Sequence, residues 1–201
     1  MVETSRRREI EDAASVLFRE HGYSGTSVRD IARALDIQGA SLYAHVTSKQ
    51  DVLWSIVERT ATRFEEAADA ALAGADPEPV PGPGSRLAAL VRAHVGVVTD
   101  DLERASVFVN EWRSLSTERR ADMSRRRDAY EKRFRTVIAD GVTAGSFAPV
   151  DPATAAAFVL TALNGIVTWY RPEGRLRPAA LAEAYADLAL RSVLALEEPV
   201  P

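Results

Sequence analysis

The sequence predicts an all-α protein of about nine helices, and three observations lead to this fold class. Apolar residues recur at intervals of three and four through long segments, which places them along one face of a helix. The alternation with a period of two that is typical of strands is almost absent. Proline, glycine and capping residues separate the segments, so we expect three helices near the N-terminus followed by a larger helical domain.

The first helix is expected over residues 4–20, where His21-Gly22 ends the pattern. The second helix is expected to begin after Ser27, because Asp30 three residues later completes a capping box. The apolar stripe of the first helix consists of Ile10, Ala13, Ala14, Leu17 and Phe18.

A tight turn at Asp36 leads to a short third helix, expected over residues 38–44. The capping pattern recurs at Ser48 and Asp51, where it begins a long linking helix over residues 48–74. We therefore expect two short helices enclosed between two longer ones.

A loop rich in proline and glycine, residues 74–85, interrupts the chain because it cannot continue any helix. The last two helices beyond it begin with Pro152 and Pro178, since proline suits the first position of a helix. The helices expected after the loop span residues 85–99, 101–114, 117–144, 152–170 and 178–196.

Composition excludes several functions before any motif is considered. The chain has 201 residues, no cysteine and a formal net charge of −4, with a pI near 5.5. The absence of cysteine and of a leader-like N-terminus predicts a cytoplasmic protein without thiol catalysis. The acidic balance argues against coating of nucleic acid by bulk charge, so any nucleic-acid site has to be local.

The two short helices and their tight turn have the arrangement of a helix-turn-helix, in which the second helix enters the major groove of DNA. Glutamine pairs with adenine, serine pairs with several bases, and an alanine methyl group contacts the thymine methyl. The residues expected to face DNA from the third helix and its end are Gln38, Gly39, Ala40, Ser41, Tyr43 and His45.

Phosphate contacts are expected from Thr26 or Ser27, from Tyr43 and His45, and from Lys49 at the start of the long helix. Residues 1–50 carry seven basic and seven acidic side chains, so charge alone does not identify this site. The alternative is a pair of short surface helices without function.

Three segments resemble the DNA-binding region of the TetR family of transcriptional repressors. They are Ala13-Ala-Ser-Val-Leu-Phe-Arg-Glu-His-Gly-Tyr-Ser-Gly-Thr-Ser-Val-Arg-Asp-Ile-Ala, Ser41-Leu-Tyr-Ala-His and Ser48-Lys-Gln-Asp-Val-Leu. The resemblance covers residues 8–56 and implies a DNA-binding domain over residues 1–50, acting as a homodimer on a palindromic double-stranded DNA operator. Asp36 stands where the family usually has glycine, and aspartate tolerates the left-handed backbone better than most residues.

The rest of the chain, residues 51–201, is expected to dimerise the protein and to bind an effector. Residues 152–170 carry no charge, but Asn164, Gly165 and three threonines favour a helix buried in protein, with no membrane as a partner. A helix that is apolar nearly all round needs neighbours on several sides. The predicted dimer interface consists of Phe158, Ala162, Ile166, Leu181, Tyr185 and Leu188.

Aromatic and amide residues on the middle and late helices are candidates for an apolar effector pocket, the alternative being ordinary core packing. They are Phe108, Asn110, Trp112, Arg113, Phe134, Asn164, Trp169 and Tyr170. The arginine-rich segment 119–135 is either a solvated helix face or an anion-binding mouth.

Two segments resemble a branch of the family that represses lipid, fatty-acid or steroid catabolism. They are Asn110-Glu-Trp-Arg-Ser-Leu and Trp169-Tyr-Arg-Pro-Glu-Gly-Arg-Leu-Arg-Pro. This resemblance implies release of DNA on binding an acyl-CoA thioester, with arginines on the CoA phosphates.

Other classes fit the sequence less well. A di-metal helical enzyme needs Glu-x-x-His spacing, which none of the three histidines has, so we expect no enzyme, no metal and no cofactor. Gly82-Pro-Gly84 lacks the preceding strand of a nucleotide loop. A dimerisation or adaptor module remains as an alternative, and it would show no salt-sensitive DNA binding.

Overall fold

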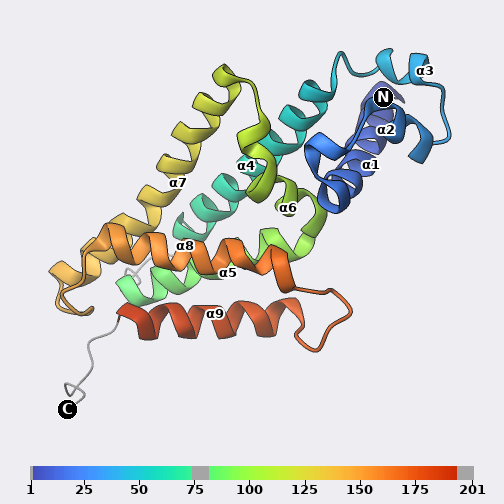
Figure 1. The fold of residues 1–201 in the computed structure, drawn as a ribbon. Helices are drawn as coiled ribbons and strands as arrows, with labels where there is room; N and C mark the ends of the chain where they lie inside the picture. The colour runs from blue at the N-terminus through green and yellow to red at the C-terminus, as the bar shows by residue number, and fades with distance from the viewer. Residues whose placement is uncertain (1, 74–81, 194–201) are drawn as a thin grey trace. The chain divides into compact units, whose positions relative to one another are not determined.

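The structure is a computed structural model, and it describes residues 2–73 and 82–193. Over these residues the chain is helical without strands, which confirms the all-α prediction (Figure 1). The elements are α1 Val2–Gly25, α2 Val28–Ala34, α3 Gly39–Tyr43, α4 Lys49–Ala73, α5 Pro83–Asp100, α6 Leu102–Glu111, the 3₁₀ turn η1 Trp112–Ser114, α7 Thr117–Thr143, α8 Pro152–Trp169 and α9 Pro178–Val193.

The first helix breaks at the glycine that was expected to end it, and a short helical stretch follows the break. Gly22 has φ 73° and ψ 161°, a conformation that breaks the helix, and helical residues resume as far as Gly25. Glycine adopts this backbone at little cost because it has no Cβ. The Thr26 hydroxyl donates to the Gly22 carbonyl at 2.9 Å and so holds the chain behind the kink.

The chain forms two compact units. The first contains residues up to 62 together with 101–126, and the second contains 63–100 together with 127 onwards. The whole predicted DNA-binding domain, residues 1–50, belongs to the first unit.

In the first unit, α1 packs against α2 and α6, and α2 packs against α3. Its core is apolar and fully buried at Ile10, Phe18, Ile31, Leu42 and Leu53. These side chains place α3 at a fixed position on the helices that precede it.

In the second unit, α5 lies along α9 and also contacts α8, and α8 packs against α9 (Figure 1). Leu87, Leu90, Phe134, Ile166 and Leu181 are among its buried core residues. The helices α8 and α9 begin as predicted, with Asp151 capping α8 through a 2.8 Å bond from the Thr154 backbone N–H.

Candidate nucleic-acid interface and effector residues

The second helix of the pair, α3, is anchored by one apolar side chain and presents polar ones. Leu42 is buried, whereas Tyr43 is 56% exposed, and Ala40 and Ser41 are also exposed. Gln38 is the N-cap, and its exposed side chain forms no capping hydrogen bond. The helix is therefore fixed on one side and open to hydrogen bonding on the other.

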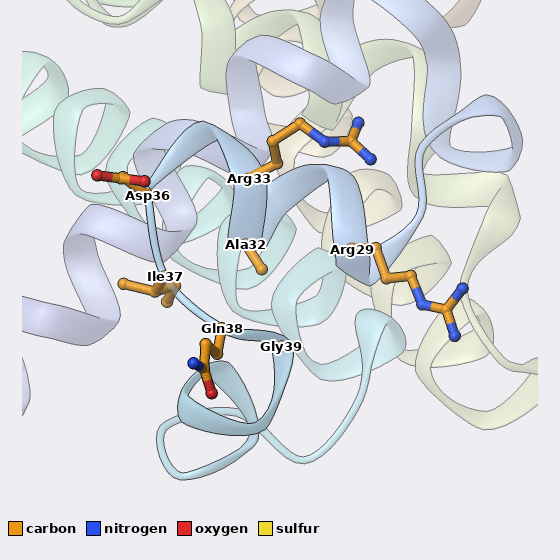
Figure 2. Close-up of a pocket in the computed structure, with 7 residues that line it drawn as sticks. All are labelled: Arg29, Ala32, Arg33, Asp36, Ile37, Gln38 and Gly39. Carbon is orange, nitrogen blue, oxygen red and sulfur yellow. The ribbon is translucent and has the colours of Figure 1, made fainter.

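The turn between α2 and α3 borders an open pocket with a volume of about 370 Å³. Asp36 holds φ 53° in this turn, the left-handed conformation that the sequence led us to expect. Figure 2 shows the side chains of Arg29 and Arg33 leaving α2 in different directions beside the pocket. The pocket is lined by Arg29, Ala32, Arg33, Asp36, Ile37, Gln38 and Gly39.

Arg29 and Arg33 were not among the residues predicted to meet DNA. Their spacing of four residues places them on neighbouring turns of α2, flanking the buried pair Ile31 and Ala32. That spacing is visible in the sequence, but the position of both arginines beside the start of α3 depends on the folded turn. Arg33 also forms an ion pair with Asp30 at 3.0 Å, whereas Arg29 is exposed.

Thr26 and Ser27 take different roles at the start of α2. The Thr26 side chain is buried and donates to a main-chain carbonyl, so its hydroxyl is engaged inside the fold. Ser27 is exposed and accepts from the Asp30 backbone N–H at 3.2 Å, while the Ser27 N–H donates to the Asp30 carboxylate at 2.9 Å. The Ser27 hydroxyl also donates to the Asp30 carboxylate at 2.6 Å, and this bond first, then the bond from the Ser27 N–H, lowers the pKa of Asp30. The reciprocal bonds confirm the predicted capping box.

Lys49 ties two helices together. Its Nζ donates to the carbonyl oxygens of Tyr23, at 2.8 Å, and Thr26, at 2.7 Å, and it lies 4.0 Å from the centroid of the Tyr23 ring. Burial lowers the pKa of Lys49. The predicted phosphate contact of Lys49 therefore competes with two bonds that hold the end of α1 against the start of α4.

Ion pairs join the arginine-rich face of α7 to α4. Arg119 pairs with Asp51 at 2.5 Å in the first unit, and Arg133 binds both carboxylate oxygens of Asp69, at 2.7 and 2.9 Å, in the second. These pairs engage the guanidinium groups of Arg119 and Arg133 with α4, and the choice between a solvated helix face and an anion-binding mouth for segment 119–135 stays a prediction.

The predicted effector residues are divided between the two units. In the first, Phe108 is buried, Asn110 donates to the Ser106 hydroxyl at 3.2 Å, and the Arg113 guanidinium lies 4.7 Å from the Trp112 ring centroid. A single pocket formed by all the predicted residues stays a prediction.

In the second unit, the predicted effector residues differ in exposure. Phe134 is fully buried and Asn164 is half-buried. Trp169 is exposed on one side, stacks on Tyr185 with ring centroids 6.4 Å apart, and contacts the buried Tyr170.

The predicted dimer residues fall into two groups. Phe158 is 62% exposed, Leu188 is 61% exposed and Ala162 is also exposed, so α8 and α9 both carry exposed apolar side chains. Ile166 and Leu181 are instead buried within the unit. Tyr185 is half-buried beneath Trp169.

Helix α8 is long and apolar enough to cross a membrane, and among the described residues no other helix meets that test. Only 28% of the segment is buried within the structure. For α8 to be buried in protein, as predicted, something other than the described residues of one copy of the chain has to cover it.

Sequence reasoning considered His94 only as a metal ligand and did not identify its actual surroundings. His94, on α5, is 2% exposed, and its Nδ1 lies 3.1 Å from the hydroxyl oxygen of Tyr130 on α7. The two residues are 36 positions apart, so their pairing depends on how α5 and α7 pack.

Comparison with known proteins finds two family matches along the chain. Residues 10–56 match the family described as "Bacterial regulatory proteins, tetR family", and residues 81–193 match "Tetracyclin repressor-like, C-terminal domain". The HTH-type transcriptional repressor KstR2 of Rhodococcus jostii (strain RHA1) is 28% identical over 190 residues, which cover 93% of this chain and 90% of that protein.

Solved structures agree over nearly the whole chain. The TetR family transcriptional regulator PfmR from Thermus thermophilus has 35% identity and a TM-score of 0.79, covering 90% of this chain and 97% of its own. AibR, solved in complex with isovaleryl coenzyme A and operator DNA, has 28% identity and a TM-score of 0.78, covering 91% and 97%. The helix-turn-helix, the helical second part and these matches together show that the chain belongs to the TetR family of transcriptional regulators and is not an enzyme.

Proposed function

We propose that this ligand-responsive TetR-family repressor works as a cytoplasmic homodimer that binds a palindromic operator through α3. The observation that carries the proposal is the composition of α3, in which Leu42 alone is buried while polar and small side chains are exposed. A short helix of this kind approaches base edges closely. A dimer doubles the number of contacts, which compensates for the neutral charge of residues 1–50.

The second copy would cover the exposed apolar face of α8 and α9. Phe158, Ala162 and Leu188 are exposed there, and apolar surface of this kind on a soluble protein marks an interaction site. An isologous contact between two copies places the same face on both sides.

The effector class that fits best is an acyl-CoA thioester. AibR is similar over nearly its whole length and was solved with isovaleryl coenzyme A. In this chain the loop after α8 carries three exposed arginines, Arg171, Arg175 and Arg177, which suit the phosphates of CoA.

The DNA-binding proposal predicts a specific loss on removal of the Tyr43 side chain. Tyr43→Ala is expected to weaken binding to an operator selected from random DNA by about 1–3 kcal/mol, with an unchanged unfolding curve, since Tyr43 is exposed. The measurement is a gel-shift titration at several salt concentrations, because phosphate contacts weaken steeply with salt. Val16→Ala, an exposed apolar position on α1, is the matched control.

Unchanged operator affinity in Tyr43→Ala would show that α3 does not bind DNA in the proposed way. The effector proposal is tested separately, by isothermal titration and operator release with acyl-CoA thioesters of different chain lengths. The absence of release by every member of that series would eliminate acyl-CoA as the effector class.

A further inference from the structure

A polar pair lies inside an aromatic cluster of the second unit. The His94 ring on α5 is 4.6 Å from the ring of Phe64 on α4, measured between centroids, and 5.8 Å from that of Tyr130 on α7. Phe134 extends the cluster, with its centroid 5.6 Å from that of Tyr130. All four side chains belong to the same unit, so their arrangement is defined within it.

One ring nitrogen of His94 lacks a hydrogen-bond partner in this cluster. Nδ1 bonds with the Tyr130 hydroxyl, but Nε2 is buried and has no hydrogen-bond partner among the described residues. Buried polar groups of side chains are paired in the large majority of cases, because an unpaired one destabilises the fold. A bound molecule with a hydrogen-bonding oxygen or nitrogen would supply the missing partner.

The hydrogen bond to Tyr130 determines which nitrogen carries the proton. If Nδ1 donated to the tyrosine oxygen, the Tyr130 hydroxyl proton and the Nε2 lone pair would both lack partners. If the Tyr130 hydroxyl donates to Nδ1, only the Nε2 proton lacks one. The second arrangement leaves fewer buried groups unpaired, so Nε2 is a donor.

Both groups are also uncharged at neutral pH. Burial first, and the nearby Arg127 second, lower the pKa of His94 to about 3, and burial raises the pKa of Tyr130. A neutral N–H donor surrounded by aromatic rings suits an uncharged oxygen, because a carboxylate would have to lose its water to enter the cluster.

We propose that Nε2 of His94 is the polar anchor of an effector site in this unit, donating to the carbonyl oxygen of a ketone, ester or thioester. Phe64, Tyr130 and Phe134 contact the apolar part of the same molecule. The proposal rests on the proposed function only because it requires a small-molecule effector. An acyl-CoA thioester has a carbonyl oxygen and so belongs to the proposed ligand class.

The test uses the full chain with ¹⁵N-labelled histidine and a matched pair of probes, 2-octanone and octanoate. Before any probe is added, His94 is expected to show a protonated Nε2 that does not titrate near pH 6.5. 2-Octanone is expected to shift the Nε2 signal and to bind at least tenfold more tightly than octanoate. A His94 that titrates normally, or an Nε2 signal that the ketone leaves unchanged, would overturn the assignment.

Two variants separate a binding role from a packing role. His94→Leu keeps an apolar side chain in the cluster and is expected to bind 2-octanone at least tenfold more weakly, with operator binding retained in a gel shift. Tyr130→Phe is expected to keep the fold and to populate both tautomers of His94. Equal ketone affinity in wild type and His94→Leu would refute the proposal. A wild-type protein that binds no operator DNA would refute the proposed function alone.

Discussion

Asp36 holds a backbone conformation that glycine adopts at lower cost. Its φ of 53° is left-handed, which costs a residue with a Cβ about 1–2 kcal/mol. Glycine avoids that cost but loses more conformational freedom on folding. We expect Asp36→Gly to raise the free energy of unfolding by about 0.5–1 kcal/mol, measured by urea denaturation. Asp36→Ala is the control, expected to lower it, and a less stable glycine variant would contradict the prediction.

Residue roles were predictable from the sequence where they depend on near neighbours. The Ser27–Asp30 capping box follows from a spacing of three residues. The left-handed Asp36 was expected because the resemblance to TetR repressors places it where that family usually has glycine. The roles of Lys49 and His94 were not predictable in this way. Lys49 bonds to carbonyls 23 and 26 positions away, and His94 pairs across 36 positions, so both depend on helix packing.

At the scale of one element, the start of α4 depends on the charge of Asp51. The Asp51 carboxylate accepts from the hydroxyls of Thr47 and Ser48 and pairs with Arg119, and the Asp51 N–H donates to Ser48 Oγ at 3.1 Å. The hydroxyl bonds first, and then Arg119, lower the pKa of Asp51 to about 2. The carboxylate therefore stays ionised in the folded protein at pH values where it takes up a proton in the unfolded chain.

This shift predicts how α4 responds to acid. Because the folded pKa lies below the unfolded value of about 3.9, the stabilisation is complete above pH 4 and is lost as the pH falls towards 2. Asp51→Asn is expected to cost about 1–2 kcal/mol at pH 5, and the difference from wild type is expected to shrink by pH 2–3. Chemical denaturation at each pH measures both values, and a difference that does not change with pH would contradict the assignment.

Helix limits were largely predictable because caps and breakers are local signals. The expected range 152–170 compares with α8 at Pro152–Trp169, and 117–144 compares with α7 at Thr117–Thr143. The first helix breaks at Gly22, where the sequence predicted its end, but the helical residues that follow the kink as far as Gly25 were not predicted. What the sequence did not show is that α4 and α7 each contribute to both compact units.

At the scale of the whole molecule, the exposed apolar residues of α8 and α9 are not covered by the described residues of a single chain. Phe158 and Leu188 are each more than 60% exposed, and the uncharged α8 segment is only 28% buried. Exposed apolar surface stabilises association at roughly 25 cal/mol per Å² before the cost of binding is subtracted. A charge at the centre of such a face would have to lose its water when the face is covered.

Phe158→Glu is therefore expected to convert a dimer into a monomer, with an intact helical spectrum because the side chain is exposed in the isolated chain. Light scattering after gel filtration measures the mass, and a gel shift measures operator binding, which is expected to fall with the dimer because two half-sites must be bound together. Val16→Glu places the same charge at an exposed apolar position of α1 and is expected to leave the mass unchanged. A Phe158→Glu protein that stayed dimeric would place the interface on another surface, while monomers that bound the operator with full affinity would show that dimerisation does not contribute to recognition.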